Sequence, residues 1–224
     1  MTALVPGELR GYRQFDLEGG GLRPLVHGAT GPWDAVLERA VCAKGLEHAP
    51  PDADCTCGLY AMYRPGSGTV ALGAANAVIR ARGRCVLGDR GFRAASARVE
   101  AVALPLTHLH RFRAARRELE AQYPHTRVYR STRRMLRDHP PQDVRELGIV
   151  PPPDRSRGYR SAAAVLWGLF VVAGYSVVLL PRERAAELAA DWWPLLVLLA
   201  LAVQAGFICL LTRLMALQQP GERL

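Results

Sequence analysis

The chain has 224 residues, half of them hydrophobic, and it carries a formal net charge of +9. That length accommodates one medium-sized domain and a further segment. The longest apolar runs lie far from the N-terminus, so we expect no cleaved signal peptide. The 29 basic residues include a single lysine, Lys44, which is typical of a high-GC, actinobacterial genome and reduces the weight of any argument from arginine alone.

The first part of the chain shows short β-strand patterns separated by turn residues. Residues 12–17 and 22–26 flank a Glu-Gly-Gly-Gly turn and predict a β-hairpin. Residues 31–47 are irregular, and we expect one helical turn around residues 33–43. Residues 58–63 fit either a short helix or a short strand.

A stronger β pattern follows, and then the hydrophobic period changes. Residues 77–104 alternate loosely around two glycines, which predicts strands that bend in a small curled antiparallel sheet. Residues 106–122 repeat apolar side chains every three or four positions and predict an amphipathic helix. Ser131 is a candidate N-cap for a second short helix. These patterns predict an α+β domain over residues 1–150, rich in antiparallel strands and with one or two amphipathic helices.

Two uncharged runs lie near the C-terminus, at residues 161–180 and 192–212. As a helix, each run is about 30 Å long, the thickness of a bilayer core. We therefore predict a two-helix transmembrane hairpin over residues 161–217, after a Pro- and Arg-rich juxtamembrane linker at 151–160 and before a tail at 218–224. Two buried helices of a soluble fold are the alternative.

Basic residues near the two runs predict their orientation. Three arginines within residues 155–160 precede the first run and Arg213 follows the second, so the positive-inside rule places both termini in the cytoplasm. The predicted location is therefore the plasma membrane, in a two-pass topology. Gln204 is the one strongly polar residue within the runs, which favours an anchor over a pore or transporter. Ala202-x-x-x-Gly206 can pack against the first run or against a second copy in a homo-oligomer.

Cysteine and histidine cluster in a short part of the predicted domain. Cys42, His48, Cys55 and Cys57 supply three thiols and one imidazole, the ligands that closed tetrahedral zinc sites use. Structural disulfides are disfavoured in a reducing cytoplasm, so zinc is the expected cofactor. The C-x5-H-x6-C-x-C spacing is not that of a standard zinc finger.

Three other interpretations of these residues stay open. Cys55 and Cys57 can form a reducible disulfide. Cys57 and Cys85 can instead be small buried hydrophobes, with His48 an ordinary loop residue. In an enzyme, Cys55 would be the nucleophile, His48 the base and Asp52 the group that orients the base. The chain has no G-x-S-x-G, P-loop, G-x-G-x-x-G or H-E-x-x-H motif, and we favour a protein without intrinsic catalysis.

A family resemblance rests on the same part of the chain. The residues that carry it are Gly11–Arg13, Trp33, Cys42, HAPP at 48–51, CTCGLYA at 55–61 and GFRA at 91–94. Over residues 10–150 the chain resembles an uncharacterised actinobacterial family with an H-x-P…C-x-C-G-[IL]-Y-A signature. The resemblance implies a shared domain and no particular reaction. Related sequences often have Leu-Trp-Gly where this chain has Cys85-Val-Leu-Gly88, so Cys85 is interpreted as a packing residue outside the metal set.

The most basic region is residues 107–137, where nine arginines face few acids. Near a membrane these side chains can contact anionic lipid head groups. Few aromatic residues interleave them, so we do not expect a nucleic-acid partner. A solvated helix face is the remaining alternative. The candidate contacts to lipid or phosphate are Arg113, Arg116, Arg117, Arg133 and Arg134.

Together these patterns predict a membrane-anchored cytoplasmic interaction or sensing module that recognises an unidentified protein partner. One alternative is a sensor-effector whose two transmembrane helices oligomerise and perturb the membrane. A second alternative is an enzyme that depends on the Cys/His cluster.

Overall fold

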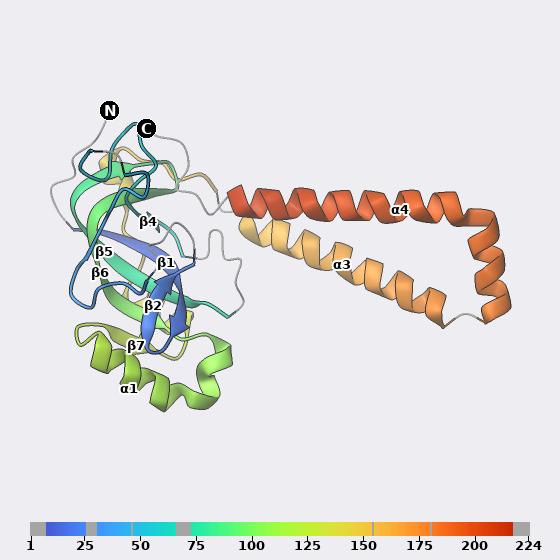
Figure 1. Ribbon diagram of the computed structural model, residues 1–224, viewed down its shortest axis with the longest axis horizontal. Coiled ribbons are helices and arrows are strands. Elements are labelled where there is room, and N and C mark those ends of the chain that lie inside the picture. Colours follow the sequence, from blue (N-terminus) through green and yellow to red (C-terminus); the bar gives the residue numbers. More distant parts are fainter. Residues whose placement is uncertain are drawn as a thin grey trace. The chain divides into compact units, whose positions relative to one another are not determined.

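The computed structural model describes residues 8–25, 31–45, 47–65, 73–153, 155–179 and 181–216. The chain divides into two compact units: one ends at Pro153 and the other holds two long C-terminal helices (Figure 1). The strands and the short helices belong to the N-terminal unit.

One mixed β-sheet forms the centre of the N-terminal unit. Its strands are β1 (Leu9–Glu18), β2 (Gly21–Pro24), β3 (Glu38–Arg39), β4 (Leu59–Met62), β5 (Ala75–Leu87), β6 (Gly91–Ala103) and β7 (Arg127–Tyr129). Strand β6 pairs with β3, β4 and β5 antiparallel and with β7 parallel. The wholly antiparallel sheet predicted from the sequence is therefore wrong for β7. A helix between β6 and β7 supplies the long crossover that parallel strands require.

Two hairpins set the register of the sheet, and the structure confirms both predictions. Strands β1 and β2 are joined by Gly19 and Gly20, with φ of 57° and 81°. Positive φ at both positions is what a two-residue type I′ turn requires. Strands β5 and β6 are joined by a tight turn in which the Gly88 N–H donates to the Gly91 carbonyl at 2.8 Å.

The helical turn predicted around residues 33–43 is wrong. The Asp34 carboxylate accepts hydrogen bonds from the N–H groups of Val36 and Leu37, and this local turn competes with a helix. The chain then enters β3, and the Ala40 N–H donates to the Ala95 carbonyl of β6 at 2.8 Å. Residues 58–63, which fit two structures, contain strand β4.

The helical segments of the N-terminal unit are η1 (Leu106–Arg111), α1 (Phe112–Gln122), α2 (Thr132–Asp138) and η2 (Val144–Leu147). The predicted amphipathic helix thus begins as a 3-10 helix and becomes α-helical in α1, with Ala115 and Leu119 buried. Ser131 is confirmed as the N-cap of α2, since its side chain accepts from the Arg134 N–H at 3.3 Å.

Helices α1 and α2 cover opposite faces of the sheet. Neighbouring residues of a strand point to opposite faces. Ala77 and Ile79 of β5 belong to the main core together with Leu119 of α1, whereas Val78 belongs to a second cluster together with Met135 of α2. Strands β1, β4, β6 and β5 pair in a closed ring, so the sheet curls on itself around the main core, and α2 packs on its other face.

The C-terminal unit consists of α3 (Ser156–Val178) and α4 (Arg182–Ala216), which pack against each other. A Cβ added at Gly206 of α4 would lie 3.5 Å from Leu166 Cδ2 of α3, so this small residue faces the partner helix within the same chain. Residues 182–191, which lie between the two predicted runs, begin α4, because they are rich in Ala, Glu, Leu and Arg. Figure 1 shows α4 bending sharply in this part, and Pro194 explains the bend because proline disrupts the preceding helical turn.

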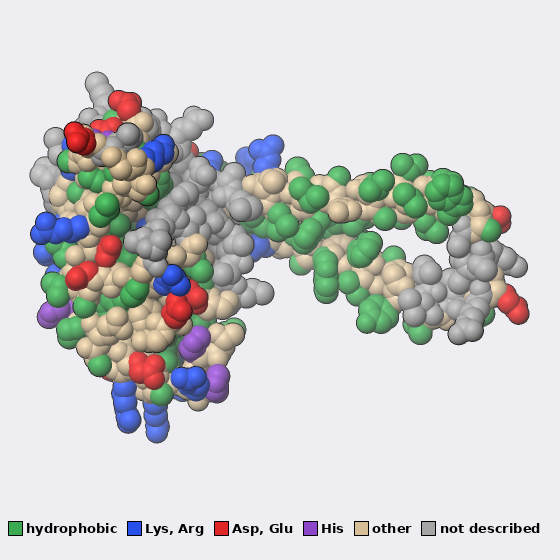
Figure 2. Space-filling view, in the orientation of Figure 1, with side chains coloured by type: hydrophobic (Ala, Val, Ile, Leu, Met, Phe, Trp, Pro, Cys, Tyr) green, Lys and Arg blue, Asp and Glu red, His purple; other side chains and the backbone are tan. Residues whose placement is uncertain are grey.

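One helix among the described residues is long and apolar enough to cross a membrane, over Ala190–Leu214 with a mean hydropathy of 2.5. It contains the second predicted span. No other helix in the described parts of the chain meets the same criterion, so the predicted pair of spans is confirmed for one helix only. The first predicted span, residues 161–180, lies mostly in α3. This helix starts at Ser156, so it also contains the charged residues Arg157 and Arg160, and it ends at Val178. Figure 2 shows hydrophobic side chains along the surface of both helices.

Candidate metal centre

The four candidate ligands lie on the loop between β3 and β4, and the sheet brings the two ends of this loop together. Both strands pair with the same edge of β6, β3 at Ser96 and Ala97 and β4 at residues 91–94, while β5 occupies the other edge. Residues 42–58, called the ligand loop below, therefore leave and rejoin the sheet at neighbouring positions. Cys42 at one end consequently lies near the C-x-C pair at the other.

The ligand atoms of Cys42, His48, Cys55 and Cys57 all lie within 4.8 Å of one another. The Sγ atoms of Cys42 and Cys55 are 3.8 Å apart, and His48 Nε2 is 3.1 Å from Cys57 Sγ. Around a tetrahedral Zn²⁺, thiolate and imidazole ligands are separated by about 3.4–3.8 Å. The four residues are therefore close enough to bind one metal ion, and the geometry is compatible with zinc.

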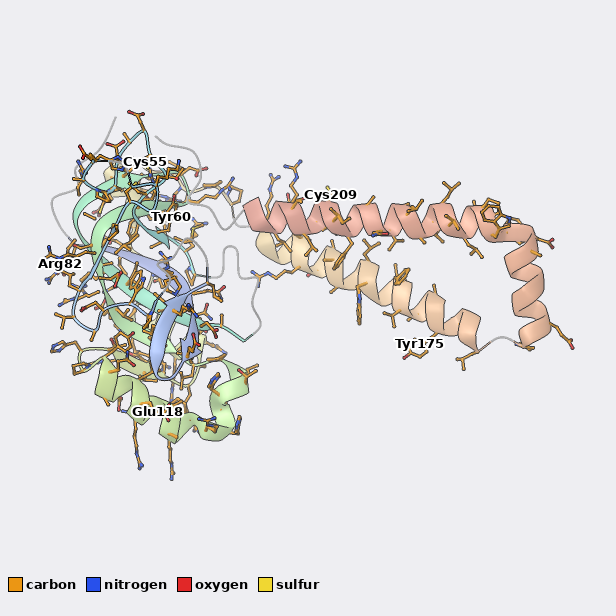
Figure 3. The ribbon with its side chains drawn as sticks, viewed as in Figure 1. Cys55, Tyr60, Arg82, Glu118, Tyr175 and Cys209 are labelled. Atoms are coloured by element: carbon orange, nitrogen blue, oxygen red, sulfur yellow. The ribbon has the colours of Figure 1, made fainter. Side chains whose placement is uncertain are left out.

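The centre is buried on one side and open on the other. Cys55 and Cys57 are 3% and 8% exposed, whereas Cys42 and His48 are partly exposed. The three thiols line a pocket of about 470 Å³ together with Lys44 and residues of β3 and β4. Figure 3 shows Cys55 and Tyr60 at the end of the N-terminal unit opposite to Glu118 of α1. A metal ion can reach the thiols through this pocket.

The surroundings push the pKa values of the two C-x-C thiols apart. Burial raises the pKa of Cys55, but hydrogen bonds from the Cys57 N–H and from the thiols of Cys57 and Cys42, with the charge of Lys44, bring it below its ordinary value. Burial and the neighbouring Cys55 thiol raise the pKa of Cys57, against a hydrogen bond from the Asp52 N–H. A bound metal ion favours the deprotonated form of every thiol ligand.

A buried arginine of β6 holds the ligand loop from beneath. Arg93 is 7% exposed, and its Nη1 donates to the carbonyl oxygens of both Cys55 and Cys57, the latter at 3.0 Å. Gly58 packs directly on this side chain: a Cβ at Gly58 would lie 3.0 Å from the Cβ atoms of Arg93 and Pro51. Its φ of +122° is also one that other residues rarely adopt. The glycine after the C-x-C pair is therefore required by the backbone.

A second buried arginine secures the strand that follows the loop. Arg13 Nη1 donates to the Tyr60 carbonyl at 2.8 Å, and its guanidinium lies 5.2 Å from the centroid of the Trp33 ring. The Tyr60 hydroxyl donates to the Thr56 carbonyl inside the ligand loop. Neither Arg13 nor Arg93 was predicted as a site residue, although both lie in segments that carry the family resemblance, Gly11–Arg13 and GFRA at 91–94.

The residues of the enzyme interpretation lie together in the ligand loop, and that interpretation stays a prediction. His48 Nε2 is placed beside Cys57 Sγ. Asp52 Oδ1 accepts the Asp54 N–H at 2.8 Å, as in an aspartate-stabilised turn. The ligand atom of His48 also lies within 4.8 Å of Cys55 Sγ.

The disulfide interpretation is also not supported, because the cysteines of the chain are all free. Cys85 lies apart from the metal cluster, in the main hydrophobic core. Burial raises its pKa to about 11. Its interpretation as a packing residue is confirmed.

The five arginines predicted to contact lipid or phosphate lie on two different helices. Arg113, Arg116 and Arg117 are exposed on α1, whereas Arg133 and Arg134 are exposed on α2, across the sheet. Figure 2 shows basic side chains projecting from the end of the unit where α1 lies. Arg116 is already paired with Glu120, with 2.7 Å between Nε and Oε1.

Comparison with known proteins adds nothing to this geometry: no family model, curated protein or solved structure matches the chain. The resemblance to the actinobacterial family with the C-x-C-G-[IL]-Y-A signature stays a prediction. Arg93 donates to the carbonyls of the two cysteines in that segment, and Gly58 packs against the Arg93 side chain.

Proposed function

We propose that the N-terminal unit is an interaction or sensing module stapled by one zinc ion, with Cys42, His48, Cys55 and Cys57 as ligands. The convergence of these four ligand atoms within 4.8 Å carries the proposal. Three thiolates and one imidazole suit Zn²⁺ far better than Mg²⁺ or Ca²⁺, which prefer oxygen. Four protein ligands leave no open position, which is the pattern of structural rather than catalytic zinc.

The staple has a structural task, because a bound metal ion would add to the hydrogen bonds from Arg93 and Tyr60 that hold the ligand loop. In its described residues the loop contains no helix or strand. When a site is not formed in the unfolded chain, the free energy of metal binding contributes to folding. Zinc would thus order the loop and the pocket beside it, and so shape a surface that a protein partner can recognise.

The membrane part of the proposal is a two-pass anchor in the plasma membrane with both termini in the cytoplasm. Support comes from the span over Ala190–Leu214, from the packing of Gly206 against α3, and from the basic residues that flank the two helices. Anionic lipids are proposed to contact Arg113, Arg116 and Arg117 of α1.

Metal analysis of the full-length protein, purified under reducing conditions in detergent, tests the zinc staple. We expect one zinc ion per chain in the wild type and loss of stoichiometric zinc in Cys55→Ser and Cys57→Ser. Cys209→Ser is the matched control, since Cys209 is an exposed thiol of α4, and it should keep its zinc. A folded wild-type protein without stoichiometric zinc would refute the staple.

Reporter fusions test the membrane topology. A fluorescent protein fused to the C-terminus should fluoresce, and alkaline phosphatase inserted between α3 and α4 should be active, because each reporter works on one side of the membrane only. Phosphatase that is active at the C-terminus and inactive between the helices would contradict the proposed orientation.

A further inference from the structure

We infer that Arg93 is the internal counter-cation of the metal centre and the residue that positions its C-x-C ligands. This inference rests on the zinc site proposed above and adds a residue outside the ligand set. It follows from three features of Arg93: its burial, its hydrogen-bond acceptors and the charge of the site that these acceptors belong to.

The charge of Arg93 is buried without a carboxylate. The side chain is 7% exposed, and no ion pair of the described residues includes it. Its Nη1 reaches two neutral carbonyl oxygens, those of Cys55 and Cys57. Removing a guanidinium from water without a compensating anion is strongly unfavourable. A nearby negative charge would offset this cost.

The metal centre can supply that charge. Zn²⁺ bound by three thiolates and one neutral imidazole has a net charge of −1, because two positive charges meet three negative ones. Two of these thiolates belong to the residues whose carbonyls Arg93 holds. The guanidinium and the metal–thiolate centre together are neutral. Arg93, Cys55 and Cys57 are buried, and electrostatic attraction between buried groups is stronger than in water.

Arg93 also fixes the backbone that carries the thiols. One Nη1 donates to the carbonyls of residues two apart, so it holds Cys55 and Cys57 in a single arrangement. Arg93 lies on β6, the strand with the most partners in the sheet. Gly58 of the ligand loop packs against the Cβ atom of Arg93. Lys44 and Arg39 line the same pocket as the thiols, but both are exposed, so their charges are screened by solvent.

The first test compares Arg93→Gln, which keeps a donor without the charge, with Arg93→Lys, which keeps the charge. Zinc affinity of the full-length protein in detergent is measured by competition with a chromophoric chelator. Loss of a residue that supports metal ligands typically weakens affinity by about 10–100-fold. We expect that loss for Arg93→Gln and a loss of less than about tenfold for Arg93→Lys. Equal affinities of the two variants would overturn the role of the charge.

The second test separates charge compensation from simple support of the loop. Cys42→His replaces one thiolate by a neutral imidazole, so the zinc centre becomes neutral. If Arg93 acts as a counter-cation, Arg93→Gln should cost less zinc affinity in the Cys42→His background than in the wild type. An undiminished cost there would assign Arg93 a purely structural role and overturn the inference. Absorption of the Co²⁺-loaded variants checks that tetrahedral coordination is kept.

Thermal unfolding gives an independent readout. With the metal chelated and the thiols protonated, the wild-type guanidinium has no counter-charge, so Arg93→Gln should be at least as stable as the wild type. With zinc bound, the order should reverse. A wild type that is more stable than Arg93→Gln by the same amount in both states would contradict the inference.

The outcomes distinguish this inference from the proposed function. If the wild type binds no zinc, the staple itself is wrong. If the wild type binds zinc and Arg93→Gln binds it equally well, the staple stands and only the role of Arg93 is wrong. If Arg93→Gln does not fold with zinc, the Arg93→Lys affinity decides, and a loss greater than about 100-fold overturns the inference.

Discussion

The sheet and the ligand loop of the N-terminal unit are held together by different forces. The sheet buries large side chains such as Phe15, Ile79 and Phe92. In the described part of the ligand loop the buried residues are Pro51, Cys55 and Cys57, and two of these three are candidate metal ligands. The sheet is thus stabilised by apolar burial, whereas the loop is held by polar groups and, in our proposal, by a metal ion. Changes in one region should therefore leave the other largely intact.

The largest expected effect comes from emptying the core of the sheet. Phe92 is fully buried on β6, and its ring centroid lies 5.9 Å from that of Tyr63. Phe92→Ala should reduce the free energy of unfolding by about 3–5 kcal/mol, measured by chemical denaturation at saturating zinc. Leu106→Ala, at a site 81% exposed, should change it by less than about 0.5 kcal/mol. Similar values for the two variants would contradict the assignment of Phe92 to the core.

A smaller effect is expected from straining the ligand loop. Gly58→Ala forces a side chain into φ +122° and against Arg93 and Pro51, which costs about 1–3 kcal/mol. It should also weaken zinc binding, measured by chelator competition. Gly73→Ala is the control, because a Cβ there meets no atom within 4 Å. Unchanged zinc affinity in Gly58→Ala would show that zinc binding does not depend on the close packing of Gly58 against Arg93.

The sheet should also respond to acid through His139, independently of the metal. Burial lowers the pKa of His139 below its ordinary value, although Glu100, 3.8 Å away, opposes this, and Arg10 adds to it. The unfolded chain therefore binds a proton more readily than the folded one, and stability falls as the pH decreases below about 6.5 towards the folded pKa. His139→Gln should flatten the stability difference between pH 7 and pH 5 relative to the wild type. An unchanged slope would exclude His139 as its source, and the protonation of the thiol ligands would then account for it.

The smallest effect is expected far from both regions. Arg116 and Glu120 of α1 form an exposed ion pair, and arginine precedes glutamate, the weaker order for a helix. Glu120→Gln should change the free energy of unfolding by less than about 0.5 kcal/mol and leave the zinc affinity unchanged. A larger loss of stability, measured by denaturation in low and high salt, would show that α1 contributes more than its buried face.

The sheet was predictable where local chemistry determines it. Gly19 and Gly20 specify a hairpin turn by themselves, and the alternation of residues 77–104 predicts the long β5–β6 hairpin. Strand β7 was not predictable, because three residues carry no periodicity and their pairing depends on how α1 returns the chain to β6. The helical turn predicted at residues 33–43 was wrong for a related reason. Strand β3 in this stretch forms through its pairing with β6 rather than through a pattern in its own residues.

The candidate metal ligands were predictable from residue type. The arginine that holds the backbone of two of them was not. Cysteine and histidine in one short stretch limit the chemistry to metal binding or thiol reactions. Arg93 stands almost 40 residues after the C-x-C pair, and nothing in a strand pattern shows which way an arginine points. The same limit applies to the arginines of α1 and α2, which follow each other closely in the sequence but lie across the sheet from one another.

By itself, the sequence determined the local features of this protein: the turns, the helix caps, one apolar span and the residue types that can bind a metal. Each depends on a few consecutive residues, whose propensities act over short distances. Only the tertiary structure decided that β3 and β4 share one edge of β6, that Cys42 therefore meets Cys55, and that a buried arginine lies beneath them. These contacts join residues far apart in the chain, and they form only when the burial of apolar side chains folds the sheet.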